Sequence, residues 1–398
     1  MADWSNVPKD LLLKIFSMSE IPDILRSAAV CVTWSDAVRE LRCSRLQLGN
    51  QSPWLMFSAD EGEDNPSAAR FYSLSEQKTY TIPRPEPSIR NRLCVGSSHG
   101  WLITADQTSE LHLLNPITGA QIDLPSVLTY DHIEPVRDER GRLTGYIERT
   151  LEDDRSPDPP RNTRGYRLDR LRLTMYVKVI LSSDPSRGDY TVVVIHNPYR
   201  RISLVRAGDN KWTTLTSDYM YDDVLFHRGQ LFASAGQMCL VVLDLASPHR
   251  KPRVVVPAND QVPRLHAGTY LVETPWSDLL YVWRCRILIS HVGKVIHTYN
   301  FVVYKVDVEG GRLVPVERSF GDIALFLGCN NSLSLALPEP IRTNCIYFTD
   351  DFILSRTVAD WRHDIGVFNY EDRSISRIFP SEAPLNSWPP PIWFMPKF

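Results

Sequence analysis

The N-terminal segment of the chain carries apolar positions at the spacing of short helices. After Pro8 the apolar residues fall at i, i+1, i+4 and i+5, so one helical face would hold Leu11, Leu12, Ile15 and Phe16. Pro8 stands where a helix can begin, because the N–H group that proline lacks has no helical partner in the first turn. The pattern predicts a helix that begins after Pro8 and carries one apolar stripe.

Two more helices are predicted downstream. The second can begin at Pro22 for the same reason, and Thr33 with Asp36 three residues later forms a capping-box-like start for the third. One side of the third helix would carry Trp34, Ala37, Val38 and Leu41. Helices this short bury little apolar surface among themselves, so we expect their faces to dock on another surface, as a helix does in a groove.

Beyond about residue 50 the pattern changes to short runs of β-branched and aromatic residues separated by Gly, Pro, Asn and Asp turns. Several stretches repeat one order of three strands that ends before a proline, as in residues 100–125 and 229–257. Such degenerate meanders predict a β-propeller, with six blades favoured and seven possible. We expect the tail at residues 389–395 to pair with residues 54–57 and close the ring.

Residues 131–170 interrupt this repeat. Their charged residues and the run Pro157-Asp158-Pro159-Pro160 form a composition that cannot bury a core. We therefore expect a long charged loop inserted between the second and third blades. It could be a solvated, variable linker or a loop that contacts a substrate.

Composition narrows the function classes. A net charge of -3 with 23% charged residues leaves no broad basic field for nucleic acid. The seven cysteines are odd in number, scattered and nowhere spaced as C-x-x-C, which predicts reduced thiols in the cytoplasm and/or nucleus and no metal site. The sequence shows neither a signal-peptide pattern nor an apolar run that could span a bilayer, so we expect no membrane anchoring.

Candidate chemistry is sparse. Gly96-Ser97-Ser98-His99-Gly100 matches G-x-S-x-G, the nucleophile elbow of serine hydrolases, but the elbow needs a following helix and residues 101–104 have a strand pattern. A turn is therefore favoured over a catalytic Ser98. Asp350 and Asp351 are interpreted as a turn with solvated or backbone-capping carboxylates. With no phosphate loop or dinucleotide fingerprint either, we expect no cofactor and no enzymatic activity.

Aromatic residues offer one binding candidate. Most tryptophans are expected to pack between propeller blades. Trp276 lies in the turn at residues 274–278 and is the one expected to be exposed. An exposed aromatic ring on a propeller rim is a weak candidate for substrate contact.

The N-terminal elements together resemble an F-box. The matching residues are Val7-Pro8, Asp10-Leu11-Leu12, Ile15-Phe16, the helix around Asp23 to Arg26, and Val30-Cys31 with Trp34. In that family the segment inserts into an adaptor of the S-phase-kinase-associated type, which joins a cullin in a RING ubiquitin ligase. The adaptor-binding residues that the resemblance implies are Val7, Pro8, Leu11, Leu12, Ile15, Phe16, Ile21, Pro22, Leu25 and Trp34.

The remainder is similar to the large plant family that joins an F-box to a kelch-like propeller of unassigned function. Motifs that carry the similarity include Pro53-Trp54-Leu55, Gly100-Trp101-Leu102 and Pro391-Ile392-Trp393. The expected fold class is α+β multidomain, with a three-helix F-box at residues 1–48 and an all-β propeller at residues 50–398. The resemblance implies a substrate receptor of an SCF-type ubiquitin ligase with an unknown protein substrate. The alternatives are a hydrolase that uses Ser98 and an F-box scaffold that does not promote degradation.

Overall fold

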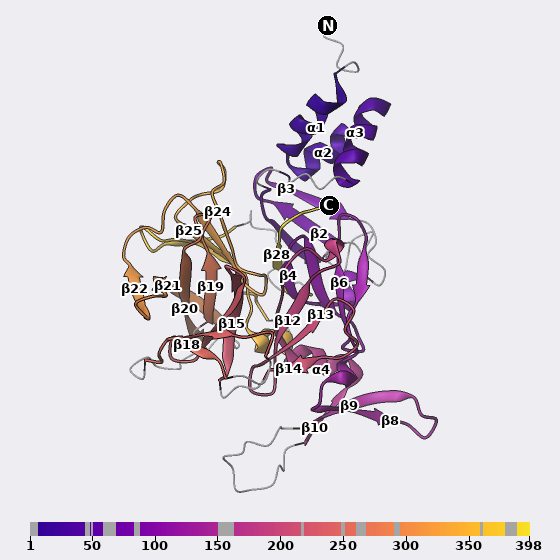
Figure 1. Ribbon diagram of the computed structural model, residues 1–398, viewed down its shortest axis with the longest axis vertical. Helices are drawn as coiled ribbons and strands as arrows, with labels where there is room; N and C mark the ends of the chain where they lie inside the picture. Colours follow the sequence, from indigo (N-terminus) through magenta and orange to yellow (C-terminus); the bar gives the residue numbers. More distant parts are fainter. Residues whose placement is uncertain are drawn as a thin grey trace.

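The computed structural model describes residues 7–43, 48, 51–58, 69–82, 88–149, 163–215, 219–247, 251–259, 268–289, 295–358, 361–378 and 388–398 of the chain. Figure 1 shows the N-terminal helices together at one end of the molecule, with sheets from the rest of the chain beneath them. The C-terminus returns to these helices, where the Arg42 guanidinium lies 5.2 Å from the centroid of the Phe398 ring.

The three N-terminal helices are α1 (Lys9–Ser17), α2 (Ile21–Ser27) and α3 (Val32–Cys43). As predicted, α1 follows Pro8, and Pro22 lies in the first turn of α2, where its missing N–H costs no bond. Helix α3 begins before Thr33, because the Ser35 N–H already donates to the Cys31 carbonyl at 2.9 Å. The predicted cap at Thr33 is therefore wrong, and Thr33 lies inside the first turn.

The described strands form six sheets of four or five strands and one sheet of three. The first contains, in spatial order, β28 (Ile392–Phe394), β1 (Trp54–Ser58), β2 (Ala69–Ser73) and β3 (Lys78–Ile82). The second contains β4 (Leu93–Ser98), β5 (Trp101–Ala105), β6 (Leu111–Leu114) and β7 (Gln121–Asp123). The third contains β11 (Tyr176–Leu181), β12 (Thr191–His196), β13 (Arg201–Arg206) and β14 (Thr213–Thr214).

The other large sheets follow in chain order. The fourth contains β15 (Tyr221–His227), β16 (Gln230–Ala235), β17 (Cys239–Leu243) and β18 (Arg253–Val256). The fifth contains β19 (Gly268–Glu273), β20 (Leu279–Ile289), β21 (Val295–Asp307) and β22 (Arg312–Val316). The sixth contains β24 (Leu333–Leu335), β23 (Ala324–Leu327), β25 (Cys345–Phe348), β26 (Gly366–Asn369) and β27 (Ile375–Ser376), with β23 and β25 parallel.

The C-terminal strand closes the first sheet. Strand β28 pairs antiparallel with β1, placing Trp54 opposite Phe394 and Leu55 opposite Trp393. This confirms the predicted pairing of the tail with residues 54–57. The closure joins the two ends of the all-β domain, so the inner edge of β1 is paired instead of exposed.

Apolar clusters join each sheet to the next. Residues that share a cluster across successive sheets include Met56 with Cys94, Val95 with Val179, Ile180 with Val224, Leu240 with Leu271, Val282 with Ile346, and Phe326 with Leu55. The series runs from the first sheet to the sixth and returns to the first. The domain is therefore a propeller-like ring, as predicted, and its cores lie between the sheets.

The segment predicted as a loop at residues 131–170 is largely regular. It contains the three-stranded sheet of β8 (Ile133–Arg137), β9 (Leu143–Arg149) and β10 (Thr163–Arg167), and α4 (Leu168–Met175) follows. Tyr146 is fully buried in the cluster between the second and third sheets, which anchors β9 to the ring. The predicted position was correct, but the expected irregular loop was wrong. Residues 150–162, including the proline run, lie outside the described residues.

Two stacked pairs of rings meet edge to face beside this insertion. His132 and His196 stack with their ring centroids 5.1 Å apart, and Tyr130 stacks on Trp212 at 5.2 Å. The His196 Nε2 lies 2.8 Å from the Ser203 hydroxyl. Burial lowers the pKa of His132 to about 4 and that of His196 to about 3, because an imidazolium would lose its hydration there.

We expect acidification from pH 7 to pH 5 to lower the free energy of unfolding by about 2 kcal/mol for each of these histidines. Their folded-state pKa values lie below the unfolded value, so the unfolded chain binds more protons as pH falls below about 6.5. Urea unfolding at both pH values measures the loss. His132→Gln/His196→Gln should remove it.

His112→Gln provides the opposite control. A hydrogen bond to Asp106 raises the pKa of His112, so protonation there favours the folded state. The variant should therefore show a larger acid loss than the wild type. An unchanged stability between pH 7 and pH 5 in the wild type would contradict the prediction.

Candidate functional site

The three helices expose an unusual amount of aliphatic surface. On α1 the side chains of Leu11 and Ile15 are 49% and 46% exposed, although both are large and apolar. The other large apolar residues exposed in this part of the chain are Met18, Leu25, Val30 and Val32. Exposed aliphatic groups concentrated on one small unit are typical of a surface that binds another protein. We call Leu11, Ile15 and Leu25 the helical face.

The predicted stripe of α1 is divided between two surfaces. Leu12 and Phe16 are buried in a cluster with Ala37, Val38 and Leu41 of α3, as the pattern of α3 predicted. The Phe16 ring meets Trp34 edge to face with centroids 5.5 Å apart. The two rows of α1 therefore have different roles: one holds the helices together, and the other is open to a partner.

The remaining residues predicted to bind the adaptor divide in the same way. Ile21 and Pro22 are buried inside the chain, Val7 and Trp34 are partly buried, and Pro8 is exposed. In this conformation the helical face and Pro8 are accessible to a partner. The other predicted residues Leu12, Phe16, Ile21 and Pro22 are buried and can affect binding only through the packing of the helices. The binding role of all these residues stays a prediction.

The helical unit is fastened to the first sheet by polar contacts. Glu20 accepts hydrogen bonds from the hydroxyls of Ser52 at 2.9 Å and Ser75 at 2.8 Å. Arg26 donates to Glu76 at 2.8 Å and also contacts the Tyr80 hydroxyl. Burial and the Glu76 carboxylate raise the pKa of Tyr80 to about 12. The same apolar cluster contains Leu12 of α1 and Trp54 of β1. These contacts fix the direction of the helical face relative to the ring.

The G-x-S-x-G segment forms a hairpin turn, as predicted. Ser98 ends β4, Trp101 opens β5 and pairs with Ser98, and the two residues between them form the turn. Both have positive φ, 53° at His99 and 86° at Gly100, the geometry of a type I′ hairpin. A Cβ at Gly100 would lie 2.4 Å from Lys397, so only glycine fits. The strand–turn–helix elbow of a serine hydrolase is absent here.

Trp276 is exposed, as predicted, with 54% of its surface accessible. Its indole N–H donates to Asp278 at 2.9 Å, and that carboxylate also pairs with Lys305 at 2.6 Å. These contacts hold the ring at the end of the fifth sheet. A substrate-binding role for Trp276 stays a prediction.

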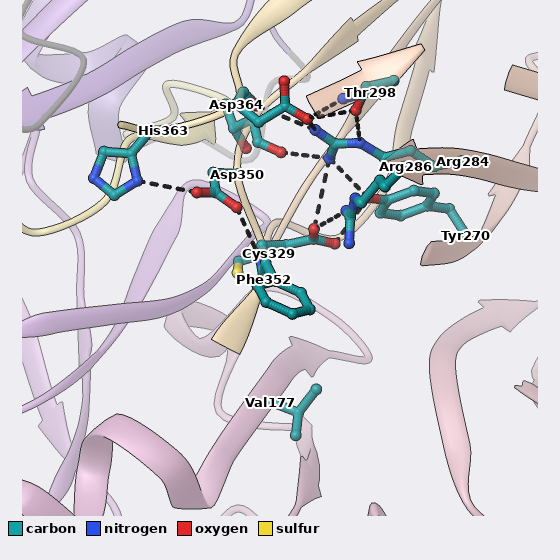
Figure 2. Close-up of polar contacts among 12 residues, drawn as sticks. Val177, Tyr270, Arg284, Arg286, Thr298, Cys329, Asp350, Phe352, His363 and Asp364 are labelled. Atoms are coloured by element: carbon teal, nitrogen blue, oxygen red, sulfur yellow. Dashed lines mark hydrogen bonds and ion pairs between the residues drawn. The ribbon is translucent and has the colours of Figure 1, made fainter. Parts of the chain in front are cut away.

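Asp350 is buried and Asp351 is partly buried, which corrects the interpretation of a solvated turn. Figure 2 shows Asp350 facing His363, at 3.2 Å; its Oδ2 also accepts from the Trp361 indole at 2.7 Å. Its Oδ1 accepts from the Phe352 N–H at 3.0 Å, so the expected backbone cap is present. Only the capping half of the interpretation was correct.

Asp351 belongs to a cluster of charges between the fifth and sixth sheets. Its Oδ2 accepts from the Tyr270 hydroxyl at 2.8 Å, and its Oδ1 pairs with Arg286 and, at 3.5 Å, with Arg284. Arg284 is fully buried and also donates to Asp364 at 3.0 Å (Figure 2). Burial alone would raise the pKa of Asp351, but the two guanidinium groups lower it to about 2.

No local sequence pattern indicates this cluster, because its members come from distant segments of the chain. Among the described residues no group of three His, Cys, Asp or Glu side chains could hold a metal ion. No helix in the described part of the chain is long and apolar enough to cross a membrane. Of the features described above, the exposed helical face is the most distinct candidate for a binding surface.

Comparison with known proteins supports this division of the chain. A family model described as KIB1-4 beta-propeller matches residues 71–369, and one described as F-box-like matches residues 4–42. The probable F-box protein At4g22060 of Arabidopsis thaliana is 23% identical over 421 residues, covering 100% of this chain and 97% of the relative. The F-box protein KIB3 of the same plant is 23% identical over 86% of this chain and 70% of its own length.

Among solved structures, the β-propeller domain of Cps50 (Swd1) from Myceliophteria thermophila aligns with 78% of this chain and 89% of its own. The identity is 9% and the TM-score is 0.31. The sequence comparisons, which span both the helices and the ring, are the informative ones.

Proposed function

Because this chain belongs to the KIB1-4 beta-propeller family of plant F-box proteins, we propose that it is the substrate-recognition subunit of an SCF-type ubiquitin ligase. The F-box would bind an adaptor of the S-phase-kinase-associated type and, through it, a cullin. The propeller would hold a target protein. The chain would act by proximity, raising the effective concentration of the target near the ubiquitin-charged enzyme without making bonds itself.

The observation that carries the proposal is the exposed helical face on three helices that already have a packed apolar core of their own. Leu12 and Phe16 make the buried apolar contacts of α1, so the packing of the helices does not explain why Leu11 and Ile15 are apolar and exposed. Aliphatic rows of this kind bind in a groove of a partner. The polar fastening through Glu20 and Arg26 supports the proposal, since a receptor must present its target at a fixed position relative to the ligase.

A second function stays open within the same class. An F-box protein could bind the adaptor as a scaffold without promoting degradation. We place either activity in the cytoplasm and/or nucleus, in keeping with the free thiols of the cysteines that the structure describes. The hairpin at Ser98 favours both of these over a hydrolase.

The test is to express the full-length chain in plant cells, capture it with its partners and compare partner abundance with and without proteasome inhibition. We expect the adaptor and cullin to be captured, and at least one propeller-bound partner to be ubiquitinated and to rise when the proteasome is blocked. Capture of the adaptor with partners whose abundance and ubiquitination do not change would favour the scaffold. Failure to capture any adaptor would contradict both functions.

A further inference from the structure

A cavity of about 730 Å³ opens among the inner strands of the third, fourth and fifth sheets. It is lined by the first strands of these sheets, through Lys178 of β11, Asp223 of β15 and Tyr270 of β19. Cys329 and Asp351, which follow strands β23 and β25 of the sixth sheet, complete its floor. The volume lies within the range of roughly 300–1,000 Å³ that is typical of small-molecule sites.

The cavity has a buried floor and an open mouth. Lys178, Tyr270 and Cys329 at the floor are buried, whereas Met220, Gly236 and Ala258 at the mouth are exposed. A ligand could therefore enter from solvent and reach charged groups that water reaches poorly. Electrostatic contacts at such a depth are stronger than at the surface.

The walls are aromatic. The rings that line the cavity are Tyr219, Tyr270, Tyr281, Trp283 and Phe352. They come from four different segments of the ring, so the aromatic wall is a product of the fold and not of one local motif. Such rings suit a ligand with a flat apolar body.

The three carboxylates that line the cavity all have partners within the protein, and that of Asp222 is Arg200. Asp223 Oδ1 accepts from the Val224 N–H at 2.9 Å, and its Oδ2 accepts from the Leu271 N–H at 2.8 Å. Asp351 is bound by Tyr270 and Arg286. A ligand that carries hydrogen-bond donors would therefore find few free acceptors on these aspartates.

Hydrogen-bond donors, in contrast, remain in excess. Lys178 Nζ lies 2.5 Å from Asp223 Oδ1, but an ammonium carries three N–H groups and this pair occupies one. The buried Trp283 Nε1 has no hydrogen-bond partner among the described residues. Arg286, which also lines the cavity, is committed through one nitrogen, Nη2, to Tyr270 and Asp351. A ligand that supplies acceptors would satisfy these groups.

We propose that this cavity is a binding site for a small molecule with a flat apolar body and an acidic group, such as a carboxylate, sulfonate or phosphate. The acidic group would lie against Lys178 and Arg286, and the body would lie between the aromatic walls. Trp283 would donate to an acceptor of the ligand. This site is independent of the helical face and of the adaptor.

The test compares two fluorescent probes on the full-length chain. 8-Anilinonaphthalene-1-sulfonate carries the acidic group, and N-phenyl-1-naphthylamine has the same ring body without it. We expect Lys178→Met/Asp223→Asn, which removes the buried pair together, to weaken sulfonate binding by about tenfold or more. Binding of the uncharged probe should change less than about threefold, because the walls are intact.

The matched control is the exposed pair of Lys305 and Asp278, which is also joined by a short contact of 2.6 Å. Lys305→Met/Asp278→Asn should leave the affinity for both probes unchanged. Hydrogen exchange should place the protection by the sulfonate in β11 and β19, far in sequence from the helical face. Trp283→Phe keeps an aromatic ring but removes the N–H donor. It should weaken sulfonate binding by about fivefold, which tests the site even if the double variant does not fold.

Three results would overturn the proposal. The first is equal sulfonate affinity in the wild type, the Lys178 double variant and Trp283→Phe. The second is protection confined to α1, α2 and α3. The third is no binding of the sulfonate at millimolar concentration. None of these outcomes bears on adaptor binding, so this inference and the proposed function can fail separately.

Discussion

A chain with Leu11→Glu and Ile15→Glu should bind an adaptor of the S-phase-kinase-associated type at least about a thousandfold more weakly than the wild type. Burying the exposed half of each aliphatic side chain contributes about 1 kcal/mol. Forcing a carboxylate into the same apolar contact costs a further ~1–3 kcal/mol per residue. The sum is about 4 kcal/mol or more, which corresponds to a thousandfold change in affinity. Titration of the purified full-length chain with adaptor by calorimetry measures it.

Two controls separate binding from folding. Val254→Glu/Val314→Glu changes two aliphatic residues of similar exposure, 44% and 41%, on the fourth and fifth sheets. It should leave adaptor affinity unchanged. Leu12→Ala/Phe16→Ala acts on the buried row instead and should lower the free energy of unfolding of the helical unit by about 5 kcal/mol or more. Wild-type affinity in the Leu11/Ile15 variant would show that the helical face is not the adaptor surface.

The division of α1 illustrates what the sequence could and could not predict. Apolar spacing and Pro8 were enough to predict the helix, because both are local signals. Leu11 with Ile15 and Leu12 with Phe16 form adjacent rows about 100° apart around the helix. The side that becomes buried depends on where α3 and β1 lie, through Leu41 and Trp54. No pattern within α1 carries that information.

In the all-β domain, too, some features could be predicted from local sequence and others could not. Ring closure by the tail was predictable because the pairing of β28 with β1 follows from the need to protect edges. The turn at Gly100 was predictable from its own residues. The strands at residues 133–149 were missed because their charged composition favours a loop. The signal that was available is Tyr146, an aromatic residue that anchors the strand to the ring core.

The charge cluster around Asp351 could not be predicted at all from local sequence. Its partners Arg284 and Arg286 come from β20, more than sixty residues earlier in the chain. A pair of aspartates after a strand has the same local pattern whether it is solvated or buried. Only the packing of the sixth sheet against the fifth decides between the two.

Removing the central cation of this cluster should strongly destabilise the ring. We expect Arg284→Met to lower the free energy of unfolding by about 3–5 kcal/mol. Arg284 is fully buried and donates to Thr298 at 2.6 Å, to the Thr349 carbonyl at 2.7 Å and to Asp364 at 3.0 Å. Methionine fills a similar space but leaves the buried Thr349 carbonyl without this donor and Asp364 without its cation.

The measurement is urea unfolding followed by tryptophan fluorescence, with an exposed ion pair as the matched control. Arg312, paired with Asp307 at 3.1 Å, is largely exposed, so Arg312→Met should cost less than about 1 kcal/mol. A loss in Arg284→Met no larger than in this control would contradict the role of the cluster. Adding Asp364→Asn to Arg284→Met should restore part of the stability, whereas Asp351 keeps Arg286 as its cation and needs no change. The reason is that much of the cost of removing one partner of a buried pair is the charge left behind, and a neutral amide carries no such charge.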